Sequence, residues 1–314
     1  STLGESGGLP GGGLPDEARL LCGGLAGIDH RPPGLHGEDH PSMAPDDLTI
    51  VVLTHNGRDV LKRCLDALFL ARPDGAQLTV IDNGSTDGAG SIGLEYGVTV
   101  IYADNQHGFI TGLNAAFQTA STPWVCFLQN DVLVRPDTFD PFFSKDFPAN
   151  GVTQLHLQNQ DGSVNHVGGQ YIWPGVGTGN RRLCPDYAFL PVDLFATAAF
   201  VMSTHTYQVV RAFDTALAPA YYEDVDYSLR LAQHGIPRYV ARDAIATHLS
   251  TYTFHRTHTK PQLSALCRKN RRYVVEKHFT GMNRMVRLAG LSVLDTLTTD
   301  RWHGDTYRPL KMEC

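Results

Sequence analysis

The chain has 314 residues, of which 42% are hydrophobic and 18% charged, with a formal net charge of −6. This length allows a substantial hydrophobic core, and the composition is that of an ordinary soluble globular protein. The negative charge argues against a general nucleic-acid binder, because such proteins usually carry a large basic excess. No stretch approaches the roughly 18 to 20 apolar residues that a membrane-spanning helix needs.

The cysteines occur without any C-x-x-C pair, and two of them lie inside apolar segments. This pattern predicts buried thiols of a reducing compartment rather than a disulfide framework or a zinc site. The chain begins with glycine-rich sequence, not with a basic patch followed by an apolar core, so we expect a cytoplasmic protein without a signal peptide. The cysteines are Cys22, Cys64, Cys126, Cys184, Cys267 and Cys314.

Residues 1–46 are rich in glycine and proline and contain one brief apolar run near Leu20. Such a segment has too little apolar surface to offset its ordering entropy alone. We therefore predict a flexible N-terminal arm, with ordered structure beginning at Leu48.

From Leu48 to about residue 135, apolar runs of strand length alternate with amphipathic stretches of helix length. This alternation predicts an α/β fold with a doubly wound, mostly parallel sheet. Apolar residues at helical spacing predict one helix around 60–68, and a second is expected at 109–119. The predicted strands are 48–53, 78–81, 98–102 and 124–128.

The following region, residues 136–260, is less regular. Asp161-Gly162 and Gly168-Gly169 punctuate short strands in a hairpin-like region. Helix and strand patterns then predict a helix at 225–233, a strand at 238–240, and two helices at 261–279 and 282–298. We therefore expect one catalytic domain over residues 47–260 and a C-terminal helical extension over residues 261–314.

Polar residues follow three of the predicted strands. Thr54–Arg58 follows the first strand, Asp82–Asp87 the second, and Gln129–Asp131 the fourth. Ligands of such sheets bind beyond the carboxyl ends of the strands, so these turns predict a binding site. The chain has neither a G-x-G-x-x-G nor a phosphate-loop motif after the first strand, so phosphate charge must be neutralised differently. A divalent cation held by Asp131 is the usual alternative.

Three acids stand at the start of the predicted helix at 225–233, in the segment Tyr221–Asp226. Free backbone N–H groups favour carboxylates there, but crowding raises the cost of ionising all three. This favours a proton acceptor or a nearby cation over simple helix capping. Farther on lies a basic cluster that suits either a phosphate-bearing ligand, an acidic lipid surface or a solvated helix face. It comprises Arg268, Lys269, Arg271, Arg272 and Lys277.

Taken in order, these segments resemble the inverting glycosyltransferases of the GT-A fold, specifically the rhamnosyltransferase-like branch of glycosyltransferase family 2. The resemblance covers about residues 48–280. Its segments are Ile50–Asn56, Val80–Asp87, Asn105–Phe109 with Gly112 and Asn114, Phe127–Asp131, Phe213–Asp214, Tyr222–Leu231, His248, and Arg268–Arg272 with Asn270.

The resemblance implies transfer of a sugar from a UDP-, dTDP- or GDP-sugar to a hydroxyl of a glycan, a lipid-linked or another acceptor. Asp224 would be the general base, and Asp131 and His248 would bind Mn²⁺ or Mg²⁺. Glu223, Asp226 and Thr197 would lie on the acceptor side. The residues implied at the donor nucleotide, with Asp82 bonding the base, are Thr54, Asn56, Arg58, Asp82, Asn83, Ser85, Asn105, Gly108, Phe109 and Asn130.

Two positions depart from the family pattern. Gln129 replaces the first acid of the D-x-D motif, and a usual glycine is missing near Thr197 and Ala198. These departures leave open the alternative that the chain is a non-catalytic module that binds nucleotide sugars. A sugar nucleotidyltransferase is a further alternative, although its glycine-rich start is missing. The segment 282–298 has apolar residues beside Arg284 and Arg287, so it is either a helix packed on the core or one in peripheral contact with a membrane.

Overall fold

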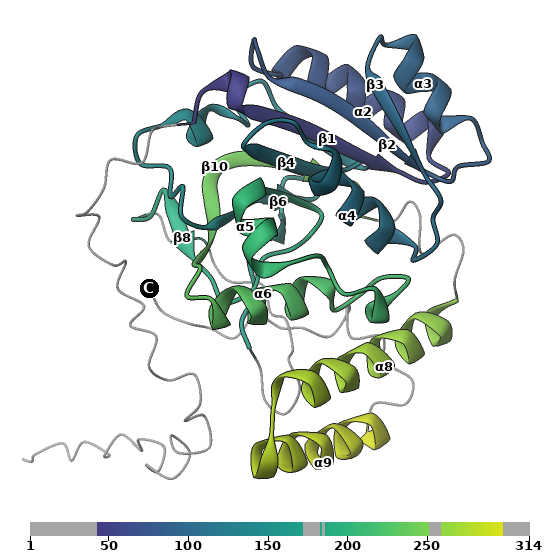
Figure 1. Cartoon of the computed structure of the whole chain (residues 1–314), viewed down its shortest axis with the longest axis vertical. Coiled ribbons are helices and arrows are strands. Elements are labelled where there is room, and N and C mark those ends of the chain that lie inside the picture. The colour runs from purple at the N-terminus through teal and green to yellow at the C-terminus, as the bar shows by residue number, and fades with distance from the viewer. Residues whose placement is uncertain (1–42, 172–182, 184–185, 251–258, 298–314) are drawn as a thin grey trace, which may run out of the picture. The chain divides into compact units, whose positions relative to one another are not determined.

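The computed structural model describes residues 43–171, 183, 186–250 and 259–297, and the statements below concern these residues (Figure 1). Most of the predicted N-terminal arm, residues 1–42, falls outside this range, as do the end of the C-terminal extension at 298–314 and Cys22, Cys184 and Cys314. Met43 is only 3% exposed and belongs to the core. Ordered structure therefore begins before the predicted Leu48.

Ten strands and seven α-helices account for most of the described chain, together with three short 3₁₀ helices. The strands are β1 (Leu48–Thr54), β2 (Gln77–Asn83), β3 (Thr99–Ala103), β4 (Trp124–Gln129), β5 (Val132–Val134), β6 (Val152–Gln158), β7 (Val164–His166), β8 (Phe189–Pro191), β9 (Ala199–Ser203) and β10 (Arg238–His248). The larger helices are α2 (Arg58–Ala71), α3 (Ala89–Glu95), α4 (Phe109–Thr119), α5 (Thr204–Val210), α6 (Glu223–Gln233), α8 (Lys260–His278) and α9 (Gly281–Leu297).

All ten strands form one sheet, in which the order β3-β2-β1-β4-β9-β6-β10-β5 forms the main path. The strands β3, β2, β1 and β4 are parallel to one another, whereas β9 is antiparallel to both of its neighbours. In the register of β1, Thr54 lies beside Asp82 of β2 and Leu53 beside Gln129 of β4. The carboxyl ends of these three strands therefore meet at the same edge.

The two faces of β1 are buried in two separate cores. Ile50 and Val52 pack with Leu61 and other residues of α2, whereas Val51 and Leu53 pack with residues of α4. Because side chains alternate along a strand, a fully buried run of this kind requires cover on both faces of the sheet. The second core also contains residues of α6, α8 and α9, which lie together in Figure 1.

The fold class and the first four strands are confirmed, as are the helices at 109–119 and in the C-terminal region, to within one or two residues. The prediction of strand 238–240 was wrong in length, because β10 continues to His248. Arg242 and Asp243 interrupt its apolar pattern at a bulge between Ala241 and Ile245. The predicted hairpin around Asp161-Gly162 is present as the antiparallel pair β6 and β7.

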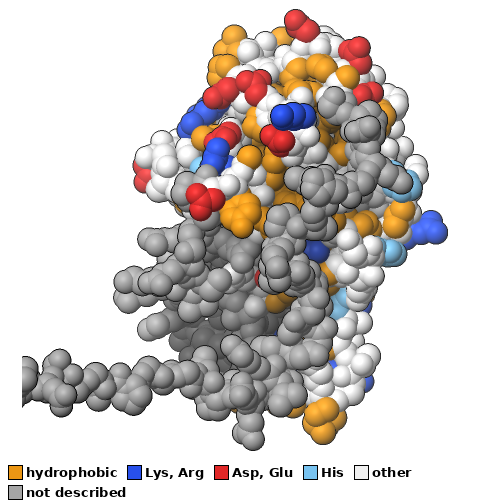
Figure 2. Space-filling view, turned by 90° about the vertical axis from the view of Figure 1, so that its left-hand side faces the viewer, with side chains coloured by type: hydrophobic (Ala, Val, Ile, Leu, Met, Phe, Trp, Pro, Cys, Tyr) orange, Lys and Arg blue, Asp and Glu red, His pale blue; other side chains and the backbone are white. Residues whose placement is uncertain are grey.

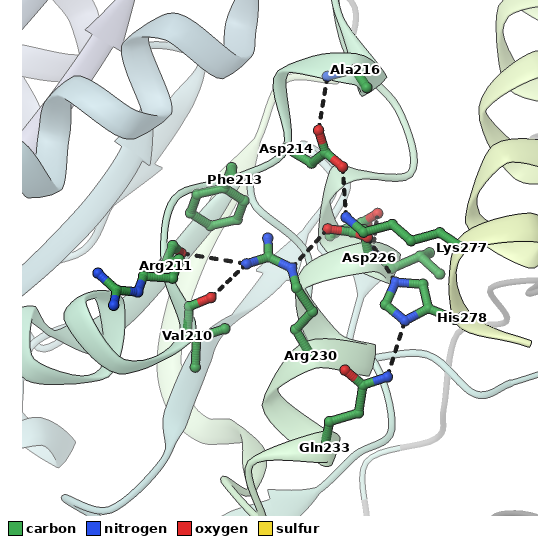
Figure 3. A network of polar contacts seen from close by, with 12 residues as sticks. Val210, Arg211, Phe213, Asp214, Ala216, Asp226, Arg230, Gln233, Lys277 and His278 are labelled. Atoms are coloured by element: carbon green, nitrogen blue, oxygen red, sulfur yellow. Dashed lines mark hydrogen bonds and ion pairs between the residues drawn. The ribbon is translucent and has the colours of Figure 1, made fainter.

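A buried group of charges fastens α8 to α6 (Figure 3). The carboxylate of Asp226, which is fully buried, accepts hydrogen bonds from Arg230 at 2.9 Å and His278 at 2.7 Å, and Lys277 Nζ lies 2.7 Å away. Burial opposes the ionisation of Asp226, but the hydrogen bond from His278 and the charges of Arg230 and Lys277 outweigh it and hold its pKa at about 2. Lys277 also donates to Asp214 at 2.6 Å.

The predicted basic cluster is largely used in contacts within the fold. Arg271 is 5% exposed and pairs with Asp295 of α9, and Arg272 pairs with Glu276 at 3.1 Å. Arg271 and Lys277 thus connect α8 with α9 and with the segment around α6, whereas Arg272 forms an exposed pair within α8. Elsewhere on the surface, acidic and basic side chains are interspersed, as the upper part of Figure 2 shows.

The helix α9 packs on the domain core and leaves an apolar stripe outside. Leu291 is 2% exposed, whereas Met282, Met285 and Val293 are 60 to 72% exposed. At 100° per residue, Arg287 lies nearer the buried side than the apolar stripe. Among the described residues, no helix is long and apolar enough to cross a membrane. Peripheral membrane contact stays a prediction.

The charge group predicts a specific stability change. Asp226→Asn leaves Lys277 and Arg230 without their buried anion, so we expect a loss of about 3 kcal/mol in unfolding free energy at pH 7. Since the folded pKa lies below the usual aspartate value, this stabilisation is complete above about pH 5 and is lost as the pH falls towards 2. Urea unfolding at several pH values measures it.

The control is Asp66→Asn, which removes the exposed pair of Asp66 with Lys62. It should cost much less than Asp226→Asn, because exposed ion pairs contribute little to stability. Equal losses for the two variants, or a loss for Asp226→Asn that does not shrink below pH 4, would contradict the role of the buried group.

Candidate active site

The first part of the site is a hydroxyl and amide pair at the ends of β1 and β4. Asn130 Nδ2 donates to Thr54 Oγ1 at 2.8 Å, and the Asn130 backbone N–H donates to the Leu53 carbonyl at 3.0 Å. Asn130 is 5% exposed and Thr54 is 1% exposed. These contacts fix the turn that presents Asp131 at the edge of the sheet.

The turns after β1 and β2 are joined to each other by side chains. The backbone N–H of Asn56 donates to Ser85 Oγ at 3.0 Å, and Asn56 Oδ1 accepts from the backbone N–H of Thr86 at 2.7 Å. Asn56 has φ of 49°, a left-handed conformation that asparagine tolerates better than most residues. Both turns are therefore held as one surface beside the strand ends.

The consecutive residues Asp82 and Asn83 have different environments. Asp82 Oδ1 accepts from the backbone N–H of Ser85 at 2.9 Å and so stabilises the turn. Asn83 Nδ2 donates to Asn105 Oδ1 at 3.0 Å and to the Gly108 carbonyl at 2.7 Å. Because a carbonyl can only accept, the second contact fixes the orientation of the amide. The remaining atom, Asn83 Oδ1, is buried without a hydrogen-bond partner.

Gly108 brings the third turn against a distant loop. Its φ is 60° and its ψ is −138°, a conformation open almost solely to glycine, and a Cβ atom there would lie 2.6 to 2.8 Å from atoms of Pro219. The next residue, Phe109, donates its backbone N–H to the Pro219 carbonyl at 2.9 Å, and its ring meets the edge of Phe127. The loop before α6 is thus docked on the turn after β3.

Asp131 and His248 face each other across the sheet edge. His248 Nε2 lies 3.4 Å from Asp131 Oδ1, and that oxygen is buried without a hydrogen-bond partner. The backbone N–H of Leu249 donates to the Asp131 carbonyl at 2.9 Å, which connects the two segments. The opposite ring nitrogen, His248 Nδ1, lies 3.1 Å from Asn165 Oδ1.

This pair fits a divalent cation. A carboxylate oxygen and an imidazole nitrogen are both accepted ligands of Mn²⁺, and the unpartnered Asp131 oxygen lacks any other compensation for its burial. Within the described ranges, no cluster of three or more His, Cys, Asp or Glu side chains could hold a metal ion. A cation between Asp131 and His248 would therefore take further ligands from a bound molecule or from water.

The acids at the start of α6 form a second centre. Glu223 is 6% exposed, its Oε1 accepts from Thr197 Oγ1 at 2.8 Å, and its Oε2 is buried without a hydrogen-bond partner. Burial raises the pKa of Glu223. Burial and, next, the charge of Glu223 raise the pKa of Asp224 to about 8. Burial, with the adjacent carboxyl as the second cause, therefore makes Asp224 a stronger base than an ordinary aspartate.

Two sets of contacts connect the acid centre with the rest of the site. The backbone N–H of Gln129 donates to the Ala198 carbonyl at 2.9 Å, next to Thr197, which binds Glu223. From α8, Asn270 Nδ2 reaches three carbonyls of the loop before α6 at 2.9 to 3.0 Å. These carbonyls belong to Leu217, Ala220 and Tyr221.

Two predicted site residues lie elsewhere. Arg58 points towards α3, where its side chain meets Ser91 at 3.4 Å and Glu95 at 3.6 Å. Asp226 is enclosed in the charge group that binds α8 and does not share the surroundings of Glu223. Their positions favour structural roles over contact with a donor or an acceptor.

The sequence did not single out three contributors to this arrangement. His55 Nδ1 lies 2.8 Å from the Asn83 carbonyl, Asn165 faces His248, and Pro219 receives the backbone of Phe109. His55 lies in the polar turn Thr54–Arg58 after the first predicted strand, so its position in the sequence indicated that it could lie near the site. Asn165 and Pro219 stand in no recognised motif, and only the folded chain brings them to the site.

The first half of the chain is similar to known glycosyltransferases. Residues 49–148 match the model described as Glycosyl transferase family 2. The glycosyltransferase GlyA of Streptococcus pneumoniae is 23% identical over 107 residues, which are 33% of this chain and 15% of GlyA. The succinoglycan biosynthesis protein ExoU of Rhizobium meliloti is 28% identical over 110 residues, 33% of this chain and 32% of ExoU. The matches thus span less than a third of either relative.

Solved structures extend the likeness to most of the chain. GalNAc-T7, crystallised with UDP, GalNAc and Mn²⁺, aligns over 73% of this chain and 47% of its own, with a TM-score of 0.58 and 18% identity. The mannosyltransferase PcManGT of Pyrobaculum calidifontis, in complex with GDP-Man and Mn²⁺, aligns over 82% and 76%, with a TM-score of 0.55 and 15% identity. These likenesses show that the chain has the GT-A fold.

The docking of Pro219 on Gly108 predicts a local effect. Gly108→Ala should cost about 2 kcal/mol or more in stability, because it combines an unfavourable backbone conformation with a collision. Gly97→Ala is the control, since Gly97 also has a positive φ, of 67°, but has open space around it. It should cost about 1 kcal/mol. Thermal unfolding of both variants measures the difference, and equal costs would refute the importance of the contact.

Proposed function

We propose that the chain is a metal-dependent, inverting glycosyltransferase that uses a nucleotide-diphosphate sugar. The observation that carries this proposal is the pairing of two centres, the Asp131 and His248 pair and the acids at the start of α6, joined through Gln129, Ala198 and Thr197. The first centre suits a diphosphate with its cation, and the second suits proton removal from an acceptor. The family 2 match over residues 49–148 supports the same reaction class.

The donor nucleotide would lie over the turns after β1, β2 and β3. The free Asn83 Oδ1 would accept a ring N–H of uracil, thymine or guanine, the bases of the expected donors. This refines the expectation for Asp82, which already holds the backbone of Ser85. Thr54, Asn56, Ser85, Asn105, Gly108, Phe109 and Asn130 would shape the surrounding surface.

Asp131 and His248 would hold a divalent cation, Mn²⁺ or Mg²⁺, next to the donor diphosphate. When bound, such an ion neutralises the charge that grows on the leaving diphosphate. Asp131 contributes the only charge at the Gln129-Asn130-Asp131 turn. Mn²⁺ accompanies the nucleotides of GalNAc-T7 and PcManGT, which supports the same class of cofactor here.

Asp224 would remove the proton from the acceptor hydroxyl as its oxygen attacks the anomeric carbon. A single displacement of this kind inverts the configuration at that carbon. Glu223 would act in the acceptor site through its free Oε2 while Thr197 holds its other oxygen. The acceptor class would be a hydroxyl of a glycan, of a lipid-linked sugar or of another molecule.

The raised pKa of Asp224 predicts the pH dependence of the reaction. The base must be ionised, so kcat/KM should rise with pH through a midpoint near pH 8 and level off above it. Asp224→Asn should lower kcat by about 100-fold or more with little change in donor affinity, and should abolish this rise. Transfer assays from pH 6 to 9 test both.

The matched control for Asp224 is Asp140→Asn, an exposed acid in the first turn of a 3₁₀ helix. It should leave the rate and its pH profile unchanged. Near wild-type transfer by Asp224→Asn, or a retained configuration in the product, would overturn the assignment.

Asp131→Ala should weaken both cation and donor binding. We expect at least a tenfold loss in Mn²⁺ affinity in the presence of the preferred nucleotide, found beforehand by a thermal-shift screen of UDP, dTDP and GDP with Mn²⁺. Asp137→Ala, at an exposed position six residues later, is the control and should bind normally. Unchanged Mn²⁺ titrations for Asp131→Ala would exclude Asp131 as a ligand.

A further inference from the structure

We propose that a chain of side chains on the β6–β7 hairpin, ending at Asn165, sets the tautomer of His248 and so turns its Nε2 lone pair towards Asp131. This inference rests on the proposed cation between Asp131 and His248, and it assigns a positioning role to residues outside every motif of the sequence. The chain of side chains, called the hairpin relay below, consists of Asp161, Ser163, Asn159 and Asn165.

The relay begins at an exposed carboxylate. Asp161 Oδ1 accepts from the Ser163 hydroxyl at 2.6 Å and from the Ser163 backbone N–H at 2.9 Å. An ionised carboxylate only accepts, and the hydrogen bonds from Ser163 lower the pKa of Asp161. Since the Ser163 hydrogen is directed at Asp161, Ser163 Oγ is left to accept from Asn159 Nδ2, which lies 2.9 Å away.

The direction of each following contact is then determined. With its Nδ2 turned to Ser163, Asn159 presents Oδ1 to Asn165 Nδ2 at 2.7 Å. Asn165 Nδ2 also donates to Ser250 Oγ at 2.7 Å, which leaves Asn165 Oδ1 to face His248 Nδ1 at 3.1 Å. The Ser250 hydroxyl also lies 3.1 Å from His248 Nδ1, but its own hydrogen is directed at the His248 carbonyl, 3.4 Å away. Since an amide oxygen cannot donate, the contact with Asn165 then requires the hydrogen on Nδ1.

The consequence falls on the other side of the imidazole ring. A neutral histidine that carries its hydrogen on Nδ1 has its lone pair on Nε2, the atom 3.4 Å from the unpartnered Asp131 Oδ1. Two electron-pair donors at this distance repel each other unless a cation lies between them. Partners that fix the tautomer of a metal-binding histidine commonly contribute 10- to 100-fold to metal affinity.

The hairpin relay also accounts for the continuous series of side-chain hydrogen bonds along this short, largely exposed hairpin. Its hydrogen bonds run in one direction from His248 to Asp161, and Val164 lies within the same strand with its side chain 45% exposed.

The experiment uses the full chain and two readouts. The first is the ¹⁵N spectrum of the histidine rings without metal, in which His248 is identified by the signal lost in His248→Gln. We expect the hydrogen on Nδ1 in the wild type and in Asn165→Asp, whose carboxylate still accepts. We expect the Nδ1 preference to be lost in Asn165→Leu. The second readout is Mn²⁺ affinity with UDP present, measured by electron paramagnetic resonance.

Asn165→Leu should lower Mn²⁺ affinity about tenfold or more, whereas Asn165→Asp should stay within about threefold of the wild type. Val164→Ala, on the same strand, is the control and should change neither readout. If Asn165→Leu does not fold, Ser163→Ala removes an exposed member of the relay instead and should weaken the Nδ1 preference.

A hydrogen on Nε2 in the wild type, or a thermal destabilisation of Asn165→Leu without any change in tautomer and Mn²⁺ affinity, would overturn the relay. Failure of the proposed function gives a different result. If the wild type binds no Mn²⁺ with UDP, dTDP or GDP, the cation proposal fails, whereas the metal-free ¹⁵N spectrum still decides the tautomer.

Discussion

The site depends on the parallel pairing of β1 with β2 and β4. This pairing places the ends of the three strands at one edge, so that the turns that follow them must share a small volume. Thr54 can then bind Asn130, although 76 positions separate them in the sequence. Burial of β1 on both faces fixes the register, because a slip by one residue would exchange the side chains facing α2 and α4.

The second half of the site is held by contacts between remote segments. The loop before α6 has left-handed backbone conformations at Tyr221 and Tyr222, and its carbonyls are collected by Asn270 of α8. On its other side Pro219 meets the turn at Gly108. The acids at the start of α6 therefore owe their position to α4 and α8 as much as to their own helix.

Much of the half from β1 to β4 could be predicted from the sequence, because its strands are uninterrupted apolar runs and its polar turns follow them directly. The length of β10 could not, since Arg242 and Asp243 lie in its middle and the bulge there is a property of sheet pairing. Its true end matters because it carries His248.

The sequence predicted which residues are candidates for the site, but not which neighbours their side chains face. Glu223 and Asp226 stand three positions apart on α6, yet one faces Thr197 and the other Lys277 of α8. A helix turns by about 100° per residue, and the sequence does not show which neighbour covers which side. For the same reason the sequence did not show that the Arg58 side chain points away from the polar turn and pairs with Glu95 of α3. Asn165 left no signal, since its partner is 83 positions away.

The attachment of α8 has a consequence for protein engineering. Exchange of C-terminal segments among related transferases is an obvious route to new acceptor preferences, with a junction in the stretch between β10 and α8. In this chain a transplanted segment would have to bring an asparagine at position 270 and basic partners for Asp214 and Asp226. Grafts chosen without these three matches would misplace the acids at the start of α6 and leave the turns after β1, β2 and β3 intact. Under the proposed function, such grafts would still bind a nucleotide but would transfer no sugar.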